Sequence, residues 1–415
     1  MEEQKYSRNL VRKISNTLEY FPAVILLGAR QVGKTTISKM IRGDWKYFDL
    51  QNPRVYERII SDPVLFFQQN SSNLILDEAQ AVPVIFDILR GIIDLDRSKK
   101  NRFIITGSSS PDLLKNSLNT LAGRAAMFEI GSLKSNEFYD KKLSNIYSLM
   151  KDKKTKREDF LNLKPVVTLN DINEFWFVGG YPEASQIERS DERSMWYHQY
   201  YMSYIEKDIS YLFPNINKDK FRRFIRVLAK MSGNILNKSD IATALEISEP
   251  TVTDYLNIAD GVFVWNNLFA YENSAIKNLT KMPKGYIRDS GLLNSLNNIS
   301  TDSIEDLYTH HLVGTFFECF AIEEVIKGIQ ASDIVKANYS YYRTYSKAEI
   351  DLIIEGDFGT IPIEIKYSSN PKKGKLKTLE NFVEKHGLNY GIVITQADEP
   401  YLIGENIVQI PINYF

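Results

Sequence analysis

Short apolar runs recur along the first 140 residues, and longer segments with a helical pattern separate them. Continuous apolar runs of this length are typical of strands that are buried on both faces of a parallel sheet. The sequence therefore predicts an α/β domain over residues 1–140, in which helices cover both faces of a parallel sheet. The expected strands lie near residues 23–28, 46–50, 73–77 and 102–106.

The middle of the chain has a different pattern. Residues 141–168 are highly charged with scattered apolar positions, which predicts a connector between domains. Residues 169–300 are predicted to be mainly helical, and residues 236–260 contain two short helical patterns around a tight turn, with Ser239 placed to cap the first. The run VFVWNNLFAY follows as an expected β-wing, so this region has the outline of a winged helix-turn-helix.

The second of these helical patterns, PTVTDYLNIAD, contains no Lys or Arg and carries Asp254 and Asp260. A recognition helix normally presents cations to phosphates and polar side chains to bases. Packing or contact with another subunit is therefore expected more than base-specific reading of DNA, and both alternatives stay open.

Residues 301–415 are predicted to form a further α/β domain. A helical pattern over residues 310–329 is followed by KAEIDLIIEGDFGTIPIEIKYSS, residues 347–369, which is typical of two strands joined by a Gly-containing turn. Carboxylates within such strands are costly to bury unless something pairs with them. Their presence in this hairpin indicates a site.

The loop pattern at residues 28–35, GARQVGKT, directly follows the first expected strand and fits a phosphate-binding loop. Gly28 and Gly33 allow backbone amides to turn inward at a helix N-terminus, where they can bind an anion. Lys34 is expected to reach the outer phosphates of ATP, and the hydroxyl of Thr35 to bind Mg²⁺. The predicted nucleotide-binding residues are Gly28, Ala29, Arg30, Gln31, Val32, Gly33, Lys34, Thr35 and Thr36.

The run NLILDEAQ, residues 73–80, supplies the acidic partner of this loop. Asp77 is expected to hold the Mg²⁺ shell, and Glu78 to orient or deprotonate an attacking water, which favours ATP hydrolysis over a kinase reaction. Thr106 or Ser108 is a candidate sensor of the terminal phosphate, or part of a hydroxyl-rich turn. Arg124 is a candidate catalytic cation from the same or a neighbouring subunit, with a surface salt bridge as its alternative role.

The carboxylates of the C-terminal hairpin predict a second site. The turn would bring Asp351 and Glu364 close together on neighbouring strands, where they repel each other unless a divalent cation lies between them. Glu318 is expected as a third acidic metal ligand from the preceding helix, with Lys366 beside the metal to position or activate water. This pattern predicts a Mg²⁺ site suited to phosphodiester hydrolysis, and its alternative is a salt-bridged cluster that holds the hairpin to the helix.

The amino-acid composition of the chain limits the number of domains, the partners and the location that we expect. A chain of 415 residues predicts two or three domains, and 43% hydrophobic and 25% charged residues are typical of a soluble globular protein. Lys and Arg number 51 and Asp and Glu number 52, so any contact with nucleic acid must come from local patches. Cys319 is the only cysteine, which excludes a disulfide framework. The N-terminus lacks an apolar signal core and no apolar run reaches membrane-spanning length, so the expected location is cytoplasmic, without a membrane partner.

The motifs together resemble a family of bacterial and archaeal AAA-type ATPases whose C-terminal portion is catalogued as a domain of unknown function. The matching stretches are GARQVGKTT, YFDLQNP, LILDEAQAVPVIFDILRGIID, ITGSSS, LAGR, GGYPE, KGYIRDSGLL and the terminal EIDLII with IEIK. The resemblance implies an ATP-binding core with Mg²⁺, a winged-helix segment and a domain similar to the PD-(D/E)xK restriction-endonuclease fold. This sequence has Glu349 and Ile350 before Asp351 where the nominal motif has Pro.

From this resemblance we expect an ATPase whose nucleotide state controls a C-terminal domain that acts on or binds DNA, with a homo-oligomer as a candidate assembly. The alternative is an ATPase regulator or scaffold in which the nuclease-like domain only binds.

Overall fold

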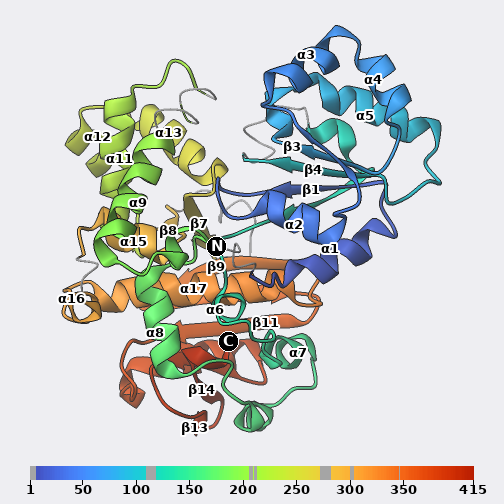
Figure 1. Cartoon of the computed structure of the whole chain (residues 1–415). Helices are drawn as coiled ribbons and strands as arrows, with labels where there is room; N and C mark the ends of the chain where they lie inside the picture. The colour runs from blue at the N-terminus through green and yellow to red at the C-terminus, as the bar shows by residue number, and fades with distance from the viewer. Residues whose placement is uncertain are drawn as a thin grey trace. The chain divides into compact units, whose positions relative to one another are not determined.

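The computed structural model describes residues 6–108, 118–204, 209, 213–271, 282–299, 303–344 and 346–415 (Figure 1). The chain divides into two compact units, which we call the N-terminal and C-terminal units. The N-terminal unit comprises residues 8–133 and 257–264, and the C-terminal unit comprises residues 1–7, 134–256 and 265–415. The boundary expected near residue 300 falls inside the C-terminal unit.

The N-terminal unit contains a five-stranded parallel sheet with the strand order β2-β3-β4-β1-β5. The central strands β1, β3 and β4 are buried along their whole length, as continuous apolar runs predict. The predicted parallel α/β architecture is thus confirmed, and β5 is a strand that the sequence did not predict. The strands are β1 (Ala23–Leu27), β2 (Lys46–Asp49), β3 (Leu74–Asp77), β4 (Phe103–Gly107) and β5 (Ala125–Glu129).

Helices lie on both faces of this sheet (Figure 1). The helices α3, α4 and α5 pack into one apolar core with the strands, and α1 and α2 lie on the opposite face. Both α3 and α4 begin with Pro at the first helical position, after Asn52 and Asp62 as side-chain caps. The helices are α1 (Leu10–Leu18), α2 (Lys34–Ile41), α3 (Pro53–Ser61), α4 (Pro63–Gln69) and α5 (Val84–Leu95), with 3-10 turns η1 (Ala79–Ala81) and η2 (Leu118–Leu121).

The C-terminal unit is built on a nine-stranded mixed sheet with the order β13-β14-β12-β11-β10-β9-β7-β8-β6. The pairs β7–β9, β11–β12 and β12–β14 are parallel and the other pairs are antiparallel. The strands are β6 (Asn234–Ile235), β7 (Trp265–Ala270), β8 (Lys284–Ile287), β9 (Ala337–Arg343), β10 (Glu349–Gly356), β11 (Gly359–Ile365), β12 (Gly391–Thr395), β13 (Tyr401–Ile403) and β14 (Ile407–Pro411).

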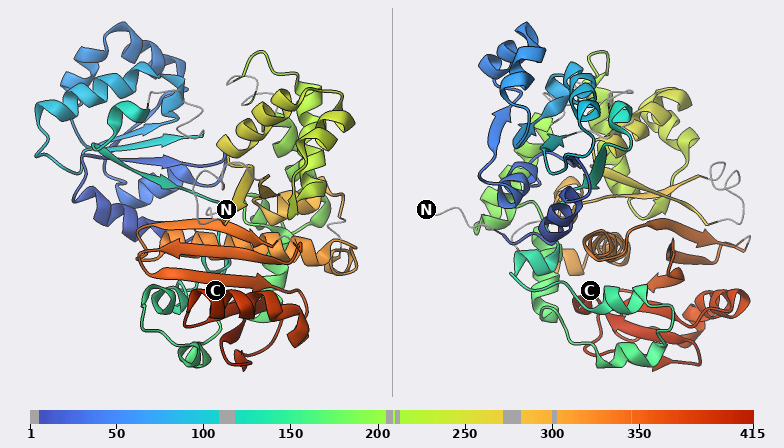
Figure 2. Two further views of the ribbon diagram at one scale, coloured as in Figure 1. Left: turned by 180° about the vertical axis from the view of Figure 1, so that it is seen from behind. Right: turned by 90° about the vertical axis from the view of Figure 1, so that its right-hand side faces the viewer.

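The predicted hairpin is formed by β10 and β11, and two helices cover its faces (Figure 2). Helix α18 (Lys377–His386) packs on Ile350 and Ile353 in an apolar cluster, and α17 (Val313–Ala331) lies along the other face. The pairing of β9 with β10 shifts its register between Ile350 and Ile353. Such a bulge lets both isoleucines face α18 while Asp351 faces α17.

Further helices lie in the C-terminal unit, and the last of them to belong to the helix-turn-helix pattern, α13 (Glu249–Gly261), continues into residues 257–264 of the N-terminal unit. The helix-turn-helix pattern corresponds to α12 and α13, and Asn237 rather than the predicted Ser239 caps α12, because its side chain accepts a hydrogen bond from the Ser239 amide. The helices are α6 (Ser135–Phe138), α7 (Ile146–Lys151), α8 (Leu169–Val178), α9 (Ser190–Ser203), α11 (Lys218–Met231), α12 (Lys238–Leu245), α13 (Glu249–Gly261), α15 (Ser290–Leu296) and α16 (Ile304–Tyr308), with 3-10 turns η3 (Arg157–Asn162), η4 (Ala184–Gln186), η6 (Lys373–Leu376) and η7 (Ile412–Tyr414).

The charged segment 141–168, predicted as a connector, packs with its apolar side chains on the rest of the C-terminal unit. Ile146 and Phe160 are buried, the Phe160 ring contacts that of Tyr390, and the Val166 amide donates to the Asn413 carbonyl at 2.8 Å. Its apolar positions therefore anchor it to the C-terminal unit while its charges face water.

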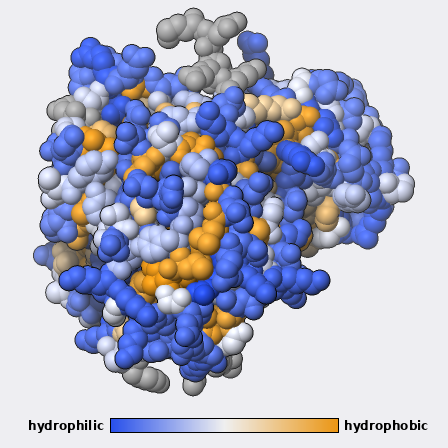
Figure 3. Space-filling view, turned by 90° about the horizontal axis from the view of Figure 1, so that it is seen from below, coloured by the Kyte–Doolittle hydropathy of each residue, from blue (hydrophilic) through white to orange (hydrophobic). Residues whose placement is uncertain are grey.

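The surface of the protein is mainly hydrophilic on the face that Figure 3 shows. On the face shown in Figure 3, hydrophilic residues predominate and hydrophobic residues form narrow bands between them. None of the helices within the described residues has both the length and the apolar character needed to cross a bilayer.

Candidate functional site

The phosphate-loop sequence connects β1 to α2 in the N-terminal unit. Gly33 is the residue before α2 and has a left-handed backbone conformation with φ of 91°. A side chain at Gly28 would collide with the carbonyl oxygen of Ile130, because the chain after β5 runs beside the loop and the Ile130 amide donates to Leu27 at 2.6 Å. Both glycines of the motif thus have a structural reason to be glycine.

Lys34 is buried at the start of α2. Its ammonium donates to the backbone carbonyls of Gly28 at 3.1 Å and Ala29 at 2.9 Å, so the side chain folds back over the loop. Arg8 also fastens the loop, since its guanidinium donates to the carbonyls of Val32 at 2.7 Å and Gly131 at 2.9 Å. No sequence pattern pointed to Arg8, which lies before the first helix.

Asp77 ends β3 and gathers three hydroxyl groups. Its Oδ2 accepts hydrogen bonds from the Thr35 hydroxyl at 2.8 Å and the Tyr47 hydroxyl at 2.7 Å, and its Oδ1 accepts one from Thr106. Burial and the contact with Asp77 raise the pKa of Tyr47, so its hydroxyl remains a donor. The structure therefore brings together Thr35 and Asp77, the two predicted Mg²⁺ ligands, and adds Tyr47, which the sequence analysis missed.

Glu78 follows Asp77 in a left-handed backbone conformation with φ of 55°. Its amide donates to the Thr106 hydroxyl at 3.0 Å, and its carboxylate accepts from the Ser108 hydroxyl at 2.6 Å and from the Gln80 amide. The two candidate sensor residues thus contact the two acidic residues: Thr106 contacts Asp77 and Glu78, and Ser108 contacts Glu78.

Arg124 does not lie with these residues. It precedes β5, and Ala125 of β5 aligns with Ala23 at the start of β1, whereas the phosphate loop follows the end of β1. Its guanidinium makes a two-point ion pair with Asp94, with both N–O distances at 2.8 Å, which lowers the pKa of Asp94 to about 2. The alternative role of Arg124, a surface salt bridge, is therefore present in the structure, and a catalytic role of Arg124 stays a prediction.

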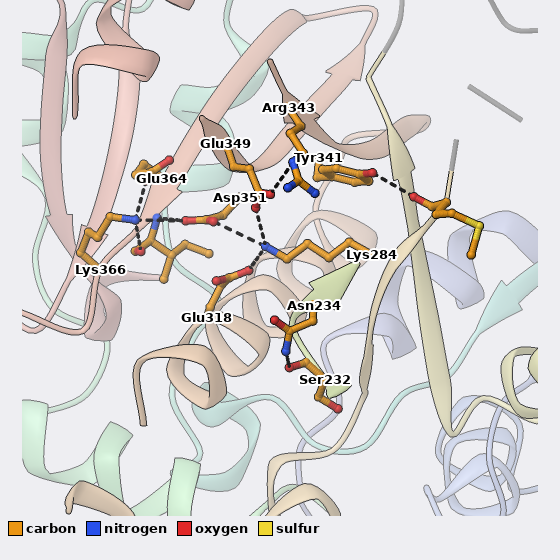
Figure 4. Close-up of polar contacts among 12 residues, drawn as sticks. Ser232, Asn234, Lys284, Glu318, Tyr341, Arg343, Glu349, Asp351, Glu364 and Lys366 are labelled. Carbon is orange, nitrogen blue, oxygen red and sulfur yellow. Dashed lines mark hydrogen bonds and ion pairs between the residues drawn. The ribbon is translucent and has the colours of Figure 1, made fainter. Parts of the chain in front are cut away.

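The predicted acidic residues of the C-terminal unit do meet, but around lysines (Figure 4). Lys366 pairs with Glu364 and lies 3.6 Å from Asp351 Oδ2, which also accepts a hydrogen bond from the Ile365 amide at 2.8 Å. Lys284, from β8, pairs with Glu318 of α17 and lies 3.6 Å from Asp351 Oδ1. We call these residues, with Glu349 and Arg343, the carboxylate–lysine cluster.

Two further residues close this cluster. Glu349 lies 3.9 Å from the Lys284 ammonium and 3.1 Å from Arg343. Four carboxylates thus face three cations, and the ammonium groups lie between the acidic residues. Burial raises the pKa of Glu318 and Glu364, and the charge of Asp351 raises both further, against the opposing effect of the lysines.

This arrangement tests the predicted metal site. Within the residues that the structure describes, no three His, Cys, Asp or Glu side chains are arranged to hold a metal ion. Both oxygens of Asp351 face ammonium groups, and only Glu364 Oε2 of the carboxylate–lysine cluster is buried without either a hydrogen bond or an ion pair among the described atoms. The residues as arranged fit ammonium ions rather than Mg²⁺, which agrees with the alternative of a salt-bridged cluster.

Comparison with known proteins identifies the class of the first domain. Residues 20–139 match the family described as the AAA domain, residues 169–303 match a domain of unknown function (DUF8612), and residues 313–415 match a second one (DUF4143). The phosphate loop between β1 and α2 thus lies within the part of the chain that matches the AAA domain.

Relatives cover most of the chain without naming a function. An uncharacterized protein of Mycobacterium tuberculosis, Rv2008c, is 28% identical over 366 residues, which are 88% of this chain and 74% of the relative. An uncharacterized protein of Methanocaldococcus jannaschii, MJ1544, is 24% identical over 401 residues, which cover 91% of this chain and 82% of the relative.

Solved structures resemble the chain more distantly. The Walker-type ATPase PABY2304 of Pyrococcus abyssi has a TM-score of 0.43 and 14% identity, and covers 71% of this chain and 97% of its own. The Aeropyrum pernix ORC1 protein in complex with DNA has a TM-score of 0.28 and 11% identity, over 71% of this chain and 93% of its own.

Proposed function

We propose that the N-terminal unit binds ATP with Mg²⁺, hydrolyses it, and controls the C-terminal unit through its nucleotide state. The observation that carries this proposal is the contact of Thr35 with Asp77 beside the phosphate loop, with Glu78 next in sequence. A hydroxyl and a carboxylate at this position are the oxygen ligands that Mg²⁺ takes in P-loop proteins. When bound, the ion neutralises charge on the outer phosphates.

Residues of the N-terminal unit bind the phosphates and activate the attacking water. The amides of residues 28–33 and the ammonium of Lys34 hold the phosphates, and this ammonium exchanges its loop carbonyls for phosphate oxygens. Glu78 accepts a proton from the attacking water as the water oxygen bonds to the terminal phosphorus and the bond to the leaving ADP oxygen breaks. Ser108 and Gln80 fix the Glu78 carboxylate for this step.

Calorimetry with a slowly hydrolysed ATP analogue and Mg²⁺ tests nucleotide binding directly. We expect heat of association in the wild type, and an affinity roughly 10-fold to 100-fold weaker in Lys34→Ala, because a charge-assisted contact contributes about 1.5–3 kcal/mol. Lys99→Ala, which removes an exposed lysine, is the matched control and should bind as the wild type does. Absence of heat in the folded wild-type protein would contradict the whole scheme.

A second candidate function concerns the C-terminal unit, and the carboxylate–lysine cluster favours it. We propose that this unit acts on or binds DNA, with Glu318, Asp351, Glu364 and Lys366 at its site and with α12 and α13 as a winged helix-turn-helix. Buried acidic residues gathered from a helix and a hairpin are costly, which supports a functional reason for them. The alternative is a scaffold in which this unit only binds, and a role of Arg124 across a subunit interface likewise stays a prediction.

Incubation with plasmid and single-stranded DNA, Mg²⁺ or Mn²⁺, and ATP separates these alternatives. For a nuclease we expect cleavage that Lys366→Ala abolishes and that loses its dependence on ATP in Lys34→Ala. ATP turnover without cleavage under either metal would instead favour the scaffold.

A further inference from the structure

Lys284 is an unexpected member of the carboxylate–lysine cluster. It begins β8, which pairs with β6 and β7 and not with the β10–β11 hairpin that carries Asp351. Its side chain is only 4% exposed. Burial of an ammonium is unfavourable, yet the charges of Glu318, Asp351 and Glu349 outweigh burial here and raise the pKa of Lys284.

Three carboxylates surround the ammonium of Lys284, as carboxylates would surround a metal ion. Its ammonium pairs with Glu318 and lies 3.6 Å from Asp351 and 3.9 Å from Glu349, so carboxylates from α17 and β10 converge on one cation (Figure 4). A divalent ion bound by the same oxygens would require contacts of about 2.0–2.6 Å. It would then occupy the place of the ammonium, and the two cations would repel each other at such short range.

Lys366 differs from Lys284 in its position. It lies directly after the end of β11, two residues beyond Glu364, its side chain is 29% exposed, and it contacts the other oxygen of Asp351. A metal ion between Glu318 and Asp351 therefore requires Lys284 to leave, whereas Lys366 can remain beside it.

We propose that Lys284 holds the place of a divalent cation between Glu318 and Asp351 and thereby closes the C-terminal site to metal. The inference rests on the proposed function of the C-terminal unit and adds an autoinhibitory residue to it. Removal of the Lys284 ammonium would leave the oxygens of Glu318 and Asp351 free to bind a metal ion.

Binding of Mn²⁺ alone tests the inference without any activity. Depletion of the free Mn²⁺ signal in electron paramagnetic resonance is measured with nucleotide-free protein. We expect Lys284→Met to bind Mn²⁺ at least 10-fold more tightly than the wild type, and Lys284→Met combined with Asp351→Asn to lose the added binding. The double variant Lys284→Met with Glu349→Gln removes one charge of each sign, and it should still gain binding if the position of Lys284 matters and not only net charge.

The possible outcomes test the inference about Lys284 separately from the proposed metal-dependent function of the C-terminal unit. Wild-type binding that depends on Asp351 and is as tight as in Lys284→Met would overturn the inference and leave a metal-dependent function standing. If neither the wild type nor folded Lys284→Met nor its charge-matched double variant shows Mn²⁺ binding that Asp351→Asn removes, both the inference and a metal-dependent C-terminal site are wrong. Should neither Lys284 variant fold, comparison of wild type with Asp351→Asn decides, because Asp351-dependent Mn²⁺ binding by the wild type contradicts a closed site.

Discussion

Replacement of Glu78 by Gln is expected to abolish most ATP turnover while nucleotide still binds. Gln has nearly the shape of Glu but cannot accept a proton from the attacking water, and general-base catalysis of this kind contributes about 10²-fold to 10⁴-fold. Ser108 and Gln80 contact this carboxylate, and Thr35 and Asp77 remain in place beside it. The measurement is steady-state ATP hydrolysis together with binding of a fluorescent ATP analogue.

A matched control separates this effect from a general loss of charge. Glu57 lies exposed on α3 of the same unit, so Glu57→Gln should leave both turnover and binding at the wild-type level. Turnover of Glu78→Gln within about twofold of the wild type would show that Glu78 does not act as the base. Loss of nucleotide binding in the same variant would instead place Glu78 among the binding residues.

The sequence was most informative where one local pattern decides the structure. The strands β1, β3 and β4 are buried on both faces, so their apolar runs were recognisable and their ends agree with the prediction to within one residue. The loop after β1 needs glycine at two positions for steric reasons. These two glycines form part of a short motif that can be recognised in the sequence. Strand β5 was missed because it is half-exposed at the sheet edge and has no continuous apolar run.

The sequence was least informative where a site depends on distant contacts. Tyr47, on β2, donates a hydrogen bond to Asp77, and Lys284, on β8, forms an ion pair with Asp351. Neither Tyr47 nor Lys284 belongs to a local sequence motif from which its contact could be predicted. For the hairpin, alternation correctly placed Asp351 near Glu364 but could not show which cation would balance them. Either a metal ion or a buried lysine can balance the negative charge of the same carboxylates, so the pattern of acidic residues alone could not predict which of the two cations is present.

A second buried ion pair lies where the chain passes between the units. The first segment of the N-terminal unit ends at Leu133, and the next residue, Lys134, pairs with Glu324 of α17 at 3.1 Å, with both side chains at most 2% exposed. Glu324 also accepts hydrogen bonds from the Ser135 amide at 3.1 Å and hydroxyl at 2.6 Å. Burial alone would raise the pKa of Glu324, but the charges of Lys134 and Lys327 and the hydrogen bonds from Ser135 outweigh it and the pKa is lowered. Lys134 and Ser135 are therefore anchored to α17, the helix that carries Glu318.

Replacement of Glu324 by Ala is expected to lower the free energy of unfolding of the C-terminal unit by about 3–5 kcal/mol, because it leaves the buried Lys134 ammonium without its carboxylate and with only its hydrogen bond to Phe415 O at 2.9 Å. Unfolding is followed by tryptophan fluorescence in a Trp45→Phe background, since the three remaining tryptophans all lie in the C-terminal unit. Glu384→Gln, at an exposed position of α18, is the control and should change the stability by less than about 0.5 kcal/mol.

The double variant Lys134→Met with Glu324→Leu distinguishes a lost attraction from an unpaired charge. A buried ion pair gains little over apolar side chains of similar volume, because desolvation offsets most of its Coulomb energy. We therefore expect the double variant to recover most of the stability that Glu324→Ala loses. A double variant at least as unstable as Glu324→Ala would instead show that the hydrogen bonds of Glu324 to Ser135 and of Lys134 to Phe415 O stabilise this segment, and that the unpaired charge of Lys134 contributes little to the loss.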